Sequence, residues 1–389
     1  MVANIVDFGA NIGNRDNASY IQKAVDSLIY GGEVLIPTGI FYTSTFYLRS
    51  NISLRLEAGA VLKAVEDAGC YASNGLFDSF GKETTSFLIA RDCENITICG
   101  DGMIDLSGKC FLDYEISQER KDFYGEERAE KSTAIPKMRI TRPILFDHCC
   151  SVKVTGIKIQ DSPCWTLTFH GSKNIRINNI EINNHPRTPH SDGIHLSGCD
   201  RVTIADCTMI CGDDCIAITS LLDYSRECKN IVITNCVLSS SSAAIRIGHK
   251  ESKVKNVLIE NICITDTNRG IAIFAGEEGR VQNVKISHVT MDTHILTMEW
   301  WGRGEPIVIC SANSTGVISN ISICDVYAEA ENKAVAVGTI EDLCIDRCDI
   351  HLVDRGGRKY AAEYDISPNG KLNVENDFKG SWYKEFSFG

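Results

Sequence analysis

Apolar and polar residues alternate through most of this chain, and one short alternating unit recurs along it. The unit starts with a small polar residue, as in Asn174-Ile175-Arg176-Ile177. Strands with one buried face show this two-residue period. Between residues 151 and 283 the units begin 23 to 29 residues apart, which is a solenoid period. Further units begin at Asn51, Asn95, Ser151, Arg201, Asn230, Asn256, Asn283 and Asn320.

The length of the repeat predicts the architecture. It is too short for a strand-helix unit with a second packed layer, and it fits one turn of a right-handed parallel β-helix. A leading Asn suits a tight bend, and stacked Asn side chains can form ladders between coils. The alternative, an antiparallel β-sandwich, would have Asn-Gly hairpins and a less regular period. We therefore predict an all-β protein, a single-stranded right-handed parallel β-helix forming one domain over residues 1–389.

Residues 17–29 depart from the alternating pattern and predict a helix. Apolar residues recur there at helical spacing, Asp16 or Asn17 can cap the start, and Gly31-Gly32 stops it. A repeat stack has an open end that exposes core and strand edges. We expect this helix to cap the N-terminal end.

Two more segments break the repeat. Residues 107–141 carry a dense run of charges and predict an exposed insertion, either a surface loop or a wall of a substrate groove. The tail, residues 354–389, leaves the repeat but is rich in aromatic residues. Such a tail is expected to pack on the open end of the stack or on a second subunit, which makes a homo-oligomer possible.

Composition narrows the function classes. The formal net charge of −12 argues against nucleic acid as a partner. No apolar run reaches the roughly 18 residues of a membrane helix, so no membrane partner is expected. The start shows no signal peptide, and the 18 cysteines are scattered through strand-like segments, as buried free thiols are. Both features favour a reducing cytoplasm. Cys211 and Cys215 could suggest zinc, but their spacing is not that of a usual metal site.

Three carboxylates give the first chemical signal. Asp192 lies just before the apolar strand-like residues Ile194 and Leu196, and Asp213-Asp214 lie just before the next such strand. If these segments are neighbouring coils, the three carboxylates converge, and like charges raise one another's pKa. A proton-holding acid beside ionised carboxylates is what glycosidic hydrolysis requires. A turn is the alternative reading of each motif taken alone.

The chain resembles glycoside hydrolase family 28, the polygalacturonase-like enzymes. Ser191-Asp192-Gly193 and Gly212-Asp213-Asp214 are similar to the family's Asn-Thr-Asp and Gly-Asp-Asp motifs. The resemblance implies a right-handed parallel β-helix and inverting hydrolysis without a metal or other cofactor. It implies that Asp213 is the general acid and that Asp192 and Asp214 activate water, with acid and base about 6.5–9.5 Å apart. Other shared segments are Asp7-Phe8-Gly9-Ala10, Leu56-Glu57-Ala58-Gly59-Ala60, Gly100-Asp101-Gly102, Arg142-Pro143 and Ser162-Pro163-Cys164-Trp165.

The departures from the family concern substrate binding. The family's Gly-His-Gly aligns with Ser242-Ala243-Ala244, and its Arg-x-Lys, which holds the substrate carboxylate, aligns with Ala272-Ile273-Phe274. Arg246 is predicted to point outward near the aspartates and could replace the lost cations, with His249 or Lys250 nearby; a solvated surface arginine is the alternative. Otherwise the substrate is neutral, and Phe274 suits stacking on a sugar.

Four further side chains are candidate substrate contacts. Trp300 and Trp301 lie in a Gly-rich segment flanked by charges, which favours a sugar platform over core packing. His190 and His195 flank Asp192. Each could orient a substrate hydroxyl or be a structural histidine.

These features predict a cytoplasmic inverting glycoside hydrolase that trims pectin-derived or related oligosaccharides, with exo-action. Three alternatives stay open: a β-helix hydrolase for a neutral glycan, a polysaccharide lyase, and an inactive glycan-binding β-helix. A lyase commonly needs calcium between carboxylates and an Arg or Lys base.

Overall fold

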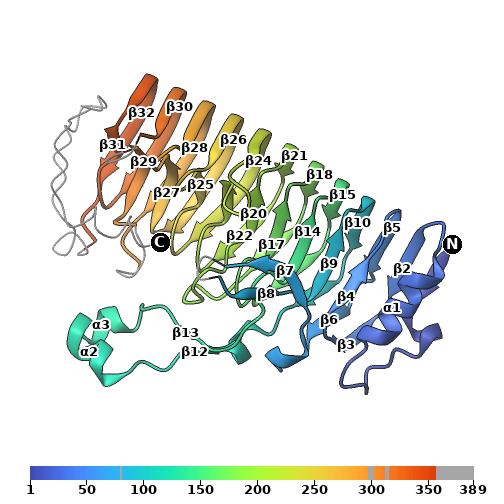
Figure 1. Cartoon of the computed structure of the whole chain (residues 1–389). Helices are drawn as coiled ribbons and strands as arrows, with labels where there is room; N and C mark the ends of the chain where they lie inside the picture. The colour runs from blue at the N-terminus through green and yellow to red at the C-terminus, as the bar shows by residue number, and fades with distance from the viewer. Residues whose placement is uncertain (79–80, 297–301, 312–314, 356–389) are drawn as a thin grey trace.

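The computed structural model describes residues 1–78, 81–296, 302–311 and 315–355. Within these residues the chain winds into an elongated stack of coils whose strands run parallel (Figure 1). Strands that are neighbours in the stack come from successive coils. This arrangement is the right-handed parallel β-helix that the repeat predicted.

One face of the solenoid is a parallel sheet with ten strands in the described residues, one from each coil. Its central strands pair in register, with Ile194 beside Ile216 and Ile216 beside Ile245. In chain order the strands are β4 (Phe46–Leu48), β9 (Leu88–Arg91), β14 (Ile144–Asp147), β17 (Leu167–His170), β20 (Ile194–Ser197), β23 (Ile216–Thr219), β25 (Ile245–Ile247), β27 (Arg269–Phe274), β29 (Glu305–Ser311) and β31 (Val335–Gly338).

The rest of each coil belongs to a second, bent sheet with eighteen strands in the described residues. Its first coils use β1 (Val2–Asn4), β2 (Gly32–Ile36), β3 (Gly39–Thr43), β5 (Ile52–Leu56), β6 (Ala60–Ala64), β10 (Glu94–Gly100), β11 (Met103–Asp105), β15 (Cys150–Thr155), β16 (Lys158–Gln160), β18 (Lys173–Asn178), β19 (Glu181–Asn183), β21 (Asp200–Ala205) and β22 (Thr208–Cys211). Later coils have one long strand each: β24 (Glu227–Ser240), β26 (Lys253–Thr267), β28 (Arg280–Thr293), β30 (Val317–Ala330) and β32 (Ile340–Leu352).

Branched apolar side chains form the core between these sheets. In the ten-stranded sheet Ile194, Ile216 and Ile245 stack on one another and are fully buried. Residues one position along each strand, such as His195 and Arg246, therefore point away from the core. Burial of each such Ile is worth about 1.5–3 kcal/mol relative to exposure. The core thus fixes the side from which every functional side chain in this sheet projects.

The leading asparagines form the predicted ladder. Asn256 donates from Nδ2 to Oδ1 of Asn230 at 2.9 Å, and Asn283 and Asn320 continue the chain at the same distance. All four have positive φ, between 54° and 58°. Asn is among the few residues that adopt this left-handed backbone readily. The ladder therefore marks a corner of each coil and holds adjacent coils in register.

The predicted cap is present as α1 (Ala18–Ser27), which covers the N-terminal end of the stack (Figure 1). Its own residues Ile21, Ala24 and Val25 are buried. Asp16 Oδ1 accepts a hydrogen bond from the Ala18 amide at 2.9 Å. The carboxylate thus satisfies a backbone donor that the first turn leaves unpaired.

The insertion at residues 107–141 projects away from the stack (Figure 1). It contains β12 (Leu112–Asp113), α2 (Gln118–Tyr124), α3 (Glu126–Ala129) and β13 (Ile135–Pro136). A separate small antiparallel pair is formed by β7 (Ser73–Phe77) and β8 (Glu83–Thr85). The predicted packing of the aromatic tail falls on residues 356–389, outside the described residues.

All eighteen cysteines lie in the described part of the chain, and each is a free thiol. Eight of them are buried, among them Cys207, Cys211 and Cys215. They pack as small apolar side chains within the coils. Among the described residues, no helix has the length and apolar character needed to cross a membrane.

Candidate active site

The three aspartates predicted from the sequence lie together on the outer side of the ten-stranded sheet. Asp192 lies two residues before β20, and Asp214 lies two residues before β23. Because the two strands pair in register, these are equivalent positions on consecutive coils, about 4.8 Å apart. One carboxylate oxygen each from Asp192, Asp213 and Asp214 lies within 4.8 Å of the other two.

This separation is shorter than the sequence-based expectation of about 6.5–9.5 Å between acid and base. The coil spacing is the reason, since Asp192 and Asp214 occupy the same row and Asp213 directly precedes Asp214. The acid–base separation implied by the family resemblance is therefore not found between these carboxylate oxygens. A water molecule attacking a sugar here would be held beside a three-carboxylate cluster rather than between two distant groups.

Asp192 is buried, with 1% of its surface exposed. Its Oδ2 lies 2.7 Å from Nδ1 of His195, and Nε2 of that histidine lies 3.1 Å from the Thr219 hydroxyl. Trp165 stacks on the imidazole with ring centroids 3.6 Å apart. His195 is itself fully buried, so it positions Asp192 and does not reach a substrate hydroxyl.

Asp214 is equally buried, and donors face both of its oxygens. Oδ1 accepts from the Ser242 hydroxyl and from the Ala243 amide, each at 3.2 Å. Oδ2 accepts from Nε of Arg246, whose Nη2 lies 3.9 Å from Asp192. These three donors hold the Asp214 carboxylate in a fixed orientation.

Asp213 is the most accessible of the three, with 8% of its surface exposed. Its Oδ1 accepts from the Asp214 amide at 3.0 Å, and His190 Nδ1 at the rim lies 3.6 Å from Oδ2. Burial and then the charge of Asp214 raise the pKa of Asp213 to about 7, while Arg246 acts in the opposite direction. Asp213 can therefore hold a proton near neutral pH.

The remaining electrostatics follow from burying three carboxylates with one cation. Burial, followed by the charges of Asp213 and Asp214, raises the pKa of Asp192. Burial alone would lower the pKa of Arg246, but the three carboxylates together raise it above its ordinary value. Arg246 therefore stays charged and partly neutralises the cluster. Arg246 lies at the aspartates as predicted, and the alternative of a solvated surface arginine is excluded because the residue is only 8% exposed.

The other residues predicted to bind substrate differ in solvent exposure and in their position relative to the aspartates. The side chain of His190 is 55% exposed at the rim. His249 is buried and Lys250 is exposed, both just beyond β25. Phe274 is 4% exposed and packs with Ala272 and neighbouring valines, so little of its ring is open to a sugar. Trp300 and Trp301 lie outside the described residues. Substrate contacts by these side chains remain predictions.

Sequence reasoning gave no role to Trp165 or Arg142, although both occur in segments shared with the family. Pairing of Leu167 with Ile194 places Trp165 in the same row as Asp192 on the preceding coil. The guanidinium of Arg142 lies 5.1 Å from the Trp165 ring centroid. Burial lowers the pKa of Arg142 to about 10. The sequence did contain this signal, because Trp165, Asp192 and Asp214 each lie two residues before a buried strand.

Comparison with known proteins identifies the class. The model of the family "Glycosyl hydrolases family 28" matches residues 34–349. A probable polygalacturonase of Vitis vinifera is 28% identical over 386 residues, covering 90% of this chain and 74% of the relative. The polygalacturonase structure from Erwinia carotovora ssp. carotovora superposes with a TM-score of 0.65 at 22% identity, covering 93% of this chain and 94% of that one. The exopolygalacturonase structure from Thermotoga maritima gives 0.62 at 21% identity, covering 89% and 92%.

The fold and the family match define a glycoside hydrolase built on a parallel β-helix. The chain belongs to glycosyl hydrolases family 28.

Proposed function

We propose that this enzyme hydrolyses pectin-derived or related oligosaccharides with inversion of configuration, removing sugars from a chain end. The single observation that carries the mechanism is the arrangement around Asp213. This carboxylic acid has a pKa near 7 and is the most exposed member of a cluster whose other two carboxylates lie deeper. It can give its proton to the leaving glycosidic oxygen.

Asp192 and Asp214 then activate the attacking water. In a retaining reaction one of them would attack the sugar directly. Asp214 accepts hydrogen bonds from Ser242, Ala243 and Arg246, and Asp192 faces His195. A carboxylate held by so many donors is a weak nucleophile but can still orient a water molecule. These contacts support inversion despite the short spacing between the oxygens.

The substrate class rests on the names of the relatives, which are polygalacturonases. Exo-action rests on the inference that short imported oligosaccharides are the substrates of a cytoplasmic enzyme. Eighteen free thiols support that compartment, because a reducing environment keeps thiols from pairing.

A neutral glycan is the second candidate substrate. On the coils after Arg246, the outward-facing side chains of the ten-stranded sheet are Ala272, Phe274 and Val308, and they pack together. The guanidinium of Arg269 lies 5.6 Å from the Phe274 ring centroid, but it is buried and its Nε lies 3.6 Å from Glu305 Oε2. A galacturonate carboxylate placed over these apolar side chains would have to compete with Glu305 for that cation, which is costly for a buried charge. An uncharged or esterified sugar would meet no such penalty.

The test is a screen of matched α-galacturonides, their methyl esters and α-galactosides, with product anomers followed by ¹H NMR. Inverted product from pectic oligosaccharides, released as single sugars, supports the proposal. A preference for the esters or galactosides shifts it to the neutral glycan. Retained configuration overturns inversion, and an unsaturated, ultraviolet-absorbing product that a chelator abolishes shows a lyase. Binding without turnover shows a glycan-binding protein.

A further inference from the structure

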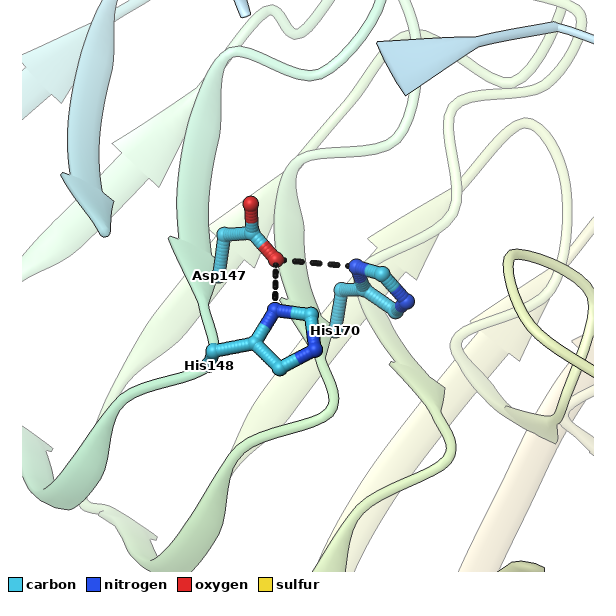
Figure 2. Close-up of side chains that lie close together, drawn as sticks. All are labelled: Asp147, His148 and His170. Atoms are coloured by element: carbon cyan, nitrogen blue, oxygen red, sulfur yellow. Dashed lines mark hydrogen bonds and ion pairs between the residues drawn. The ribbon is translucent and has the colours of Figure 1, made fainter. Parts of the chain in front are cut away.

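A second cluster of titratable side chains lies on the same sheet, and hydrolysis does not use it. It consists of Asp147, His148 and His170 (Figure 2). Asp147 ends β14, His170 ends β17, and the two residues are paired in register. The pairing of His170 with Ser197 places His170 five residues beyond Asp192 along the strand direction and one strand away, and Asp147 lies one strand further. At about 3.3 Å per residue and about 4.8 Å per strand, this is a separate site.

The backbone brings neighbouring residues to one point. Successive side chains of a strand normally point to opposite faces. His148 has a positive φ of 54°, so the chain turns directly after β14 and its ring returns toward Asp147. Nδ1 of His148 lies 2.6 Å from Asp147 Oδ1, and Nδ1 of His170 lies 2.9 Å from the same oxygen. Three potential ligand atoms therefore converge.

A purely hydrogen-bonded network is incompletely satisfied here. Two imidazoles would each direct an Nδ1 proton at one carboxylate oxygen. His170 is only 6% exposed, and its Nε2 is buried without a hydrogen-bond partner among the described residues. Buried polar networks with unpaired members are rare in proteins. Nε2 lies on the side of the ring away from Asp147 (Figure 2), so the network is incompletely satisfied there, while Nδ1 is the atom that joins the converging ligand atoms.

We propose that Asp147, His148 and His170 bind a divalent transition-metal ion of the zinc type. One carboxylate oxygen and two imidazole nitrogens form a donor set that suits such ions, with a fourth position left for water. As the ion binds at Nδ1, each imidazole moves its proton from Nδ1 to Nε2, so both histidines remain neutral ligands. Ligand atoms on a tetrahedral zinc ion are roughly 3.3 Å apart, given bonds of about 2.0 Å. The observed 2.6 and 2.9 Å therefore need to widen by about 0.7 and about 0.4 Å.

Arg91 orients the carboxylate for this role. Its Nε contacts Asp147 Oδ2 at 2.6 Å, and its Nη2 donates to the Asn74 carbonyl. The oxygen facing away from the imidazoles is thereby fixed, as partners behind metal ligands commonly do. A bound ion would join the coils of β14 and β17.

The test is titration of the full-length, chelator-treated protein with Zn²⁺ by calorimetry and with Co²⁺ by visible absorption. We expect calorimetry to show one Zn²⁺ ion bound per chain, and we expect the Co²⁺ protein to show the absorption bands of a tetrahedral site. Affinity should fall at least tenfold in His170→Ala and in His148→Ala. The second variant lies at the surface, where its fold is easier to preserve.

Two controls locate the ion. His351→Ala removes an exposed histidine that pairs with Asp349 at 3.1 Å, and it should leave binding unchanged. Asp213→Asn alters the other carboxylate cluster and should also leave it unchanged. The proposal would be overturned if the wild type bound no ion, or if His148→Ala and His170→Ala bound it as tightly as the wild type. A loss of binding confined to Asp213→Asn would also overturn it.

Discussion

Nε of Arg246 donates a hydrogen bond to Oδ2 of Asp214, and this buried ion pair provides positive charge at the centre of the site. The arginine projects from β25, one coil beyond Asp214. It also lies 3.9 Å from Asp192. Because burial of three carboxylates is costly without a counter-charge, Arg246 lets the cluster exist at neutral pH.

Replacing Arg246 should therefore change the pH profile as well as the rate. The charge of Arg246 lowers the pKa values of Asp192 and Asp213. In Arg246→Gln both values should rise, so the alkaline limb of kcat/KM should move to higher pH. The free energy of unfolding should fall by about 3–5 kcal/mol, as is usual when one partner of a buried pair is removed. Arg246→Lys keeps the charge and should leave the limb in place; identical limbs in all three proteins would contradict this role.

The alkaline limb of the wild type should reflect Asp213. A general acid must be protonated to act, so activity should fall as pH rises through about 7. The pH dependence of kcat/KM, measured on a substrate with a poor leaving group, checks this expectation. A rate that is flat from pH 5 to pH 9, or that rises across pH 7, would assign the acid to another group.

Removing the same carboxyl should stabilise the protein. Asp213 has a pKa near 7 in the folded chain and an ordinary value of 3.8. Between these values the folded state holds the proton and the unfolded state does not, so stability falls as pH rises from about 4 to about 7. Asp213→Asn lacks this penalty. Its free energy of unfolding in urea should exceed that of wild type by roughly 1–4 kcal/mol at pH 8, and the difference should vanish near pH 4. Surface Asp223→Asn is the control and should gain nothing.

Trp165 should act on catalysis through His195. The indole stacks on the imidazole that contacts Asp192, so a smaller side chain would let that carboxylate move. Trp165→Ala should lower kcat by roughly tenfold to a hundredfold, since small misplacements of catalytic groups are costly. It should also shift the acidic limb of the profile. Trp165→Phe keeps a stacked ring and should recover most of the rate; equal loss in both variants would point to direct sugar contact.

The asparagine ladder should contribute measurably to stability. Asn256 donates to Asn230 and accepts from Asn283, and its φ is 58°. Asn256→Ala loses both bonds and places an alanine in a left-handed conformation, so unfolding should become easier by about 2–3 kcal/mol. Asn256→Gly loses the bonds without the strain and should cost less. Urea denaturation compares them, and a glycine variant less stable than the alanine variant would exclude the strain argument.

Much of this molecule could be predicted from its sequence because a solenoid is specified locally. The period of 23 to 29 residues and the alternating isoleucines fix which residues stack, so the convergence of Asp192, Asp213 and Asp214 followed. The helix at residues 17–29 could be predicted from its apolar spacing, and it is found as Ala18–Ser27.

The rest depended on side-chain contacts between coils. Whether Arg246 faces solvent or Asp214 depends on the space left by Ala217 and Ala243, which the pattern alone does not reveal. The short distance between the carboxylate oxygens follows from in-register pairing of β20 and β23, together with the side-chain conformations, which the sequence pattern does not specify. The Asp147 cluster requires a left-handed residue at His148, and although histidine is enriched in that conformation, most histidines do not adopt it, so the sequence alone does not place the turn.

The most direct test of the central claim is the leaving-group dependence of Asp213→Asn. An oligosaccharide needs a proton on its departing oxygen, whereas a glycosyl fluoride of the same sugar needs much less help. We expect the variant to lose roughly 10²–10⁴-fold in kcat/KM on the oligosaccharide and less than about tenfold on the fluoride. Equal losses on both substrates, or full activity on the oligosaccharide, would contradict the assignment of Asp213 as the proton donor.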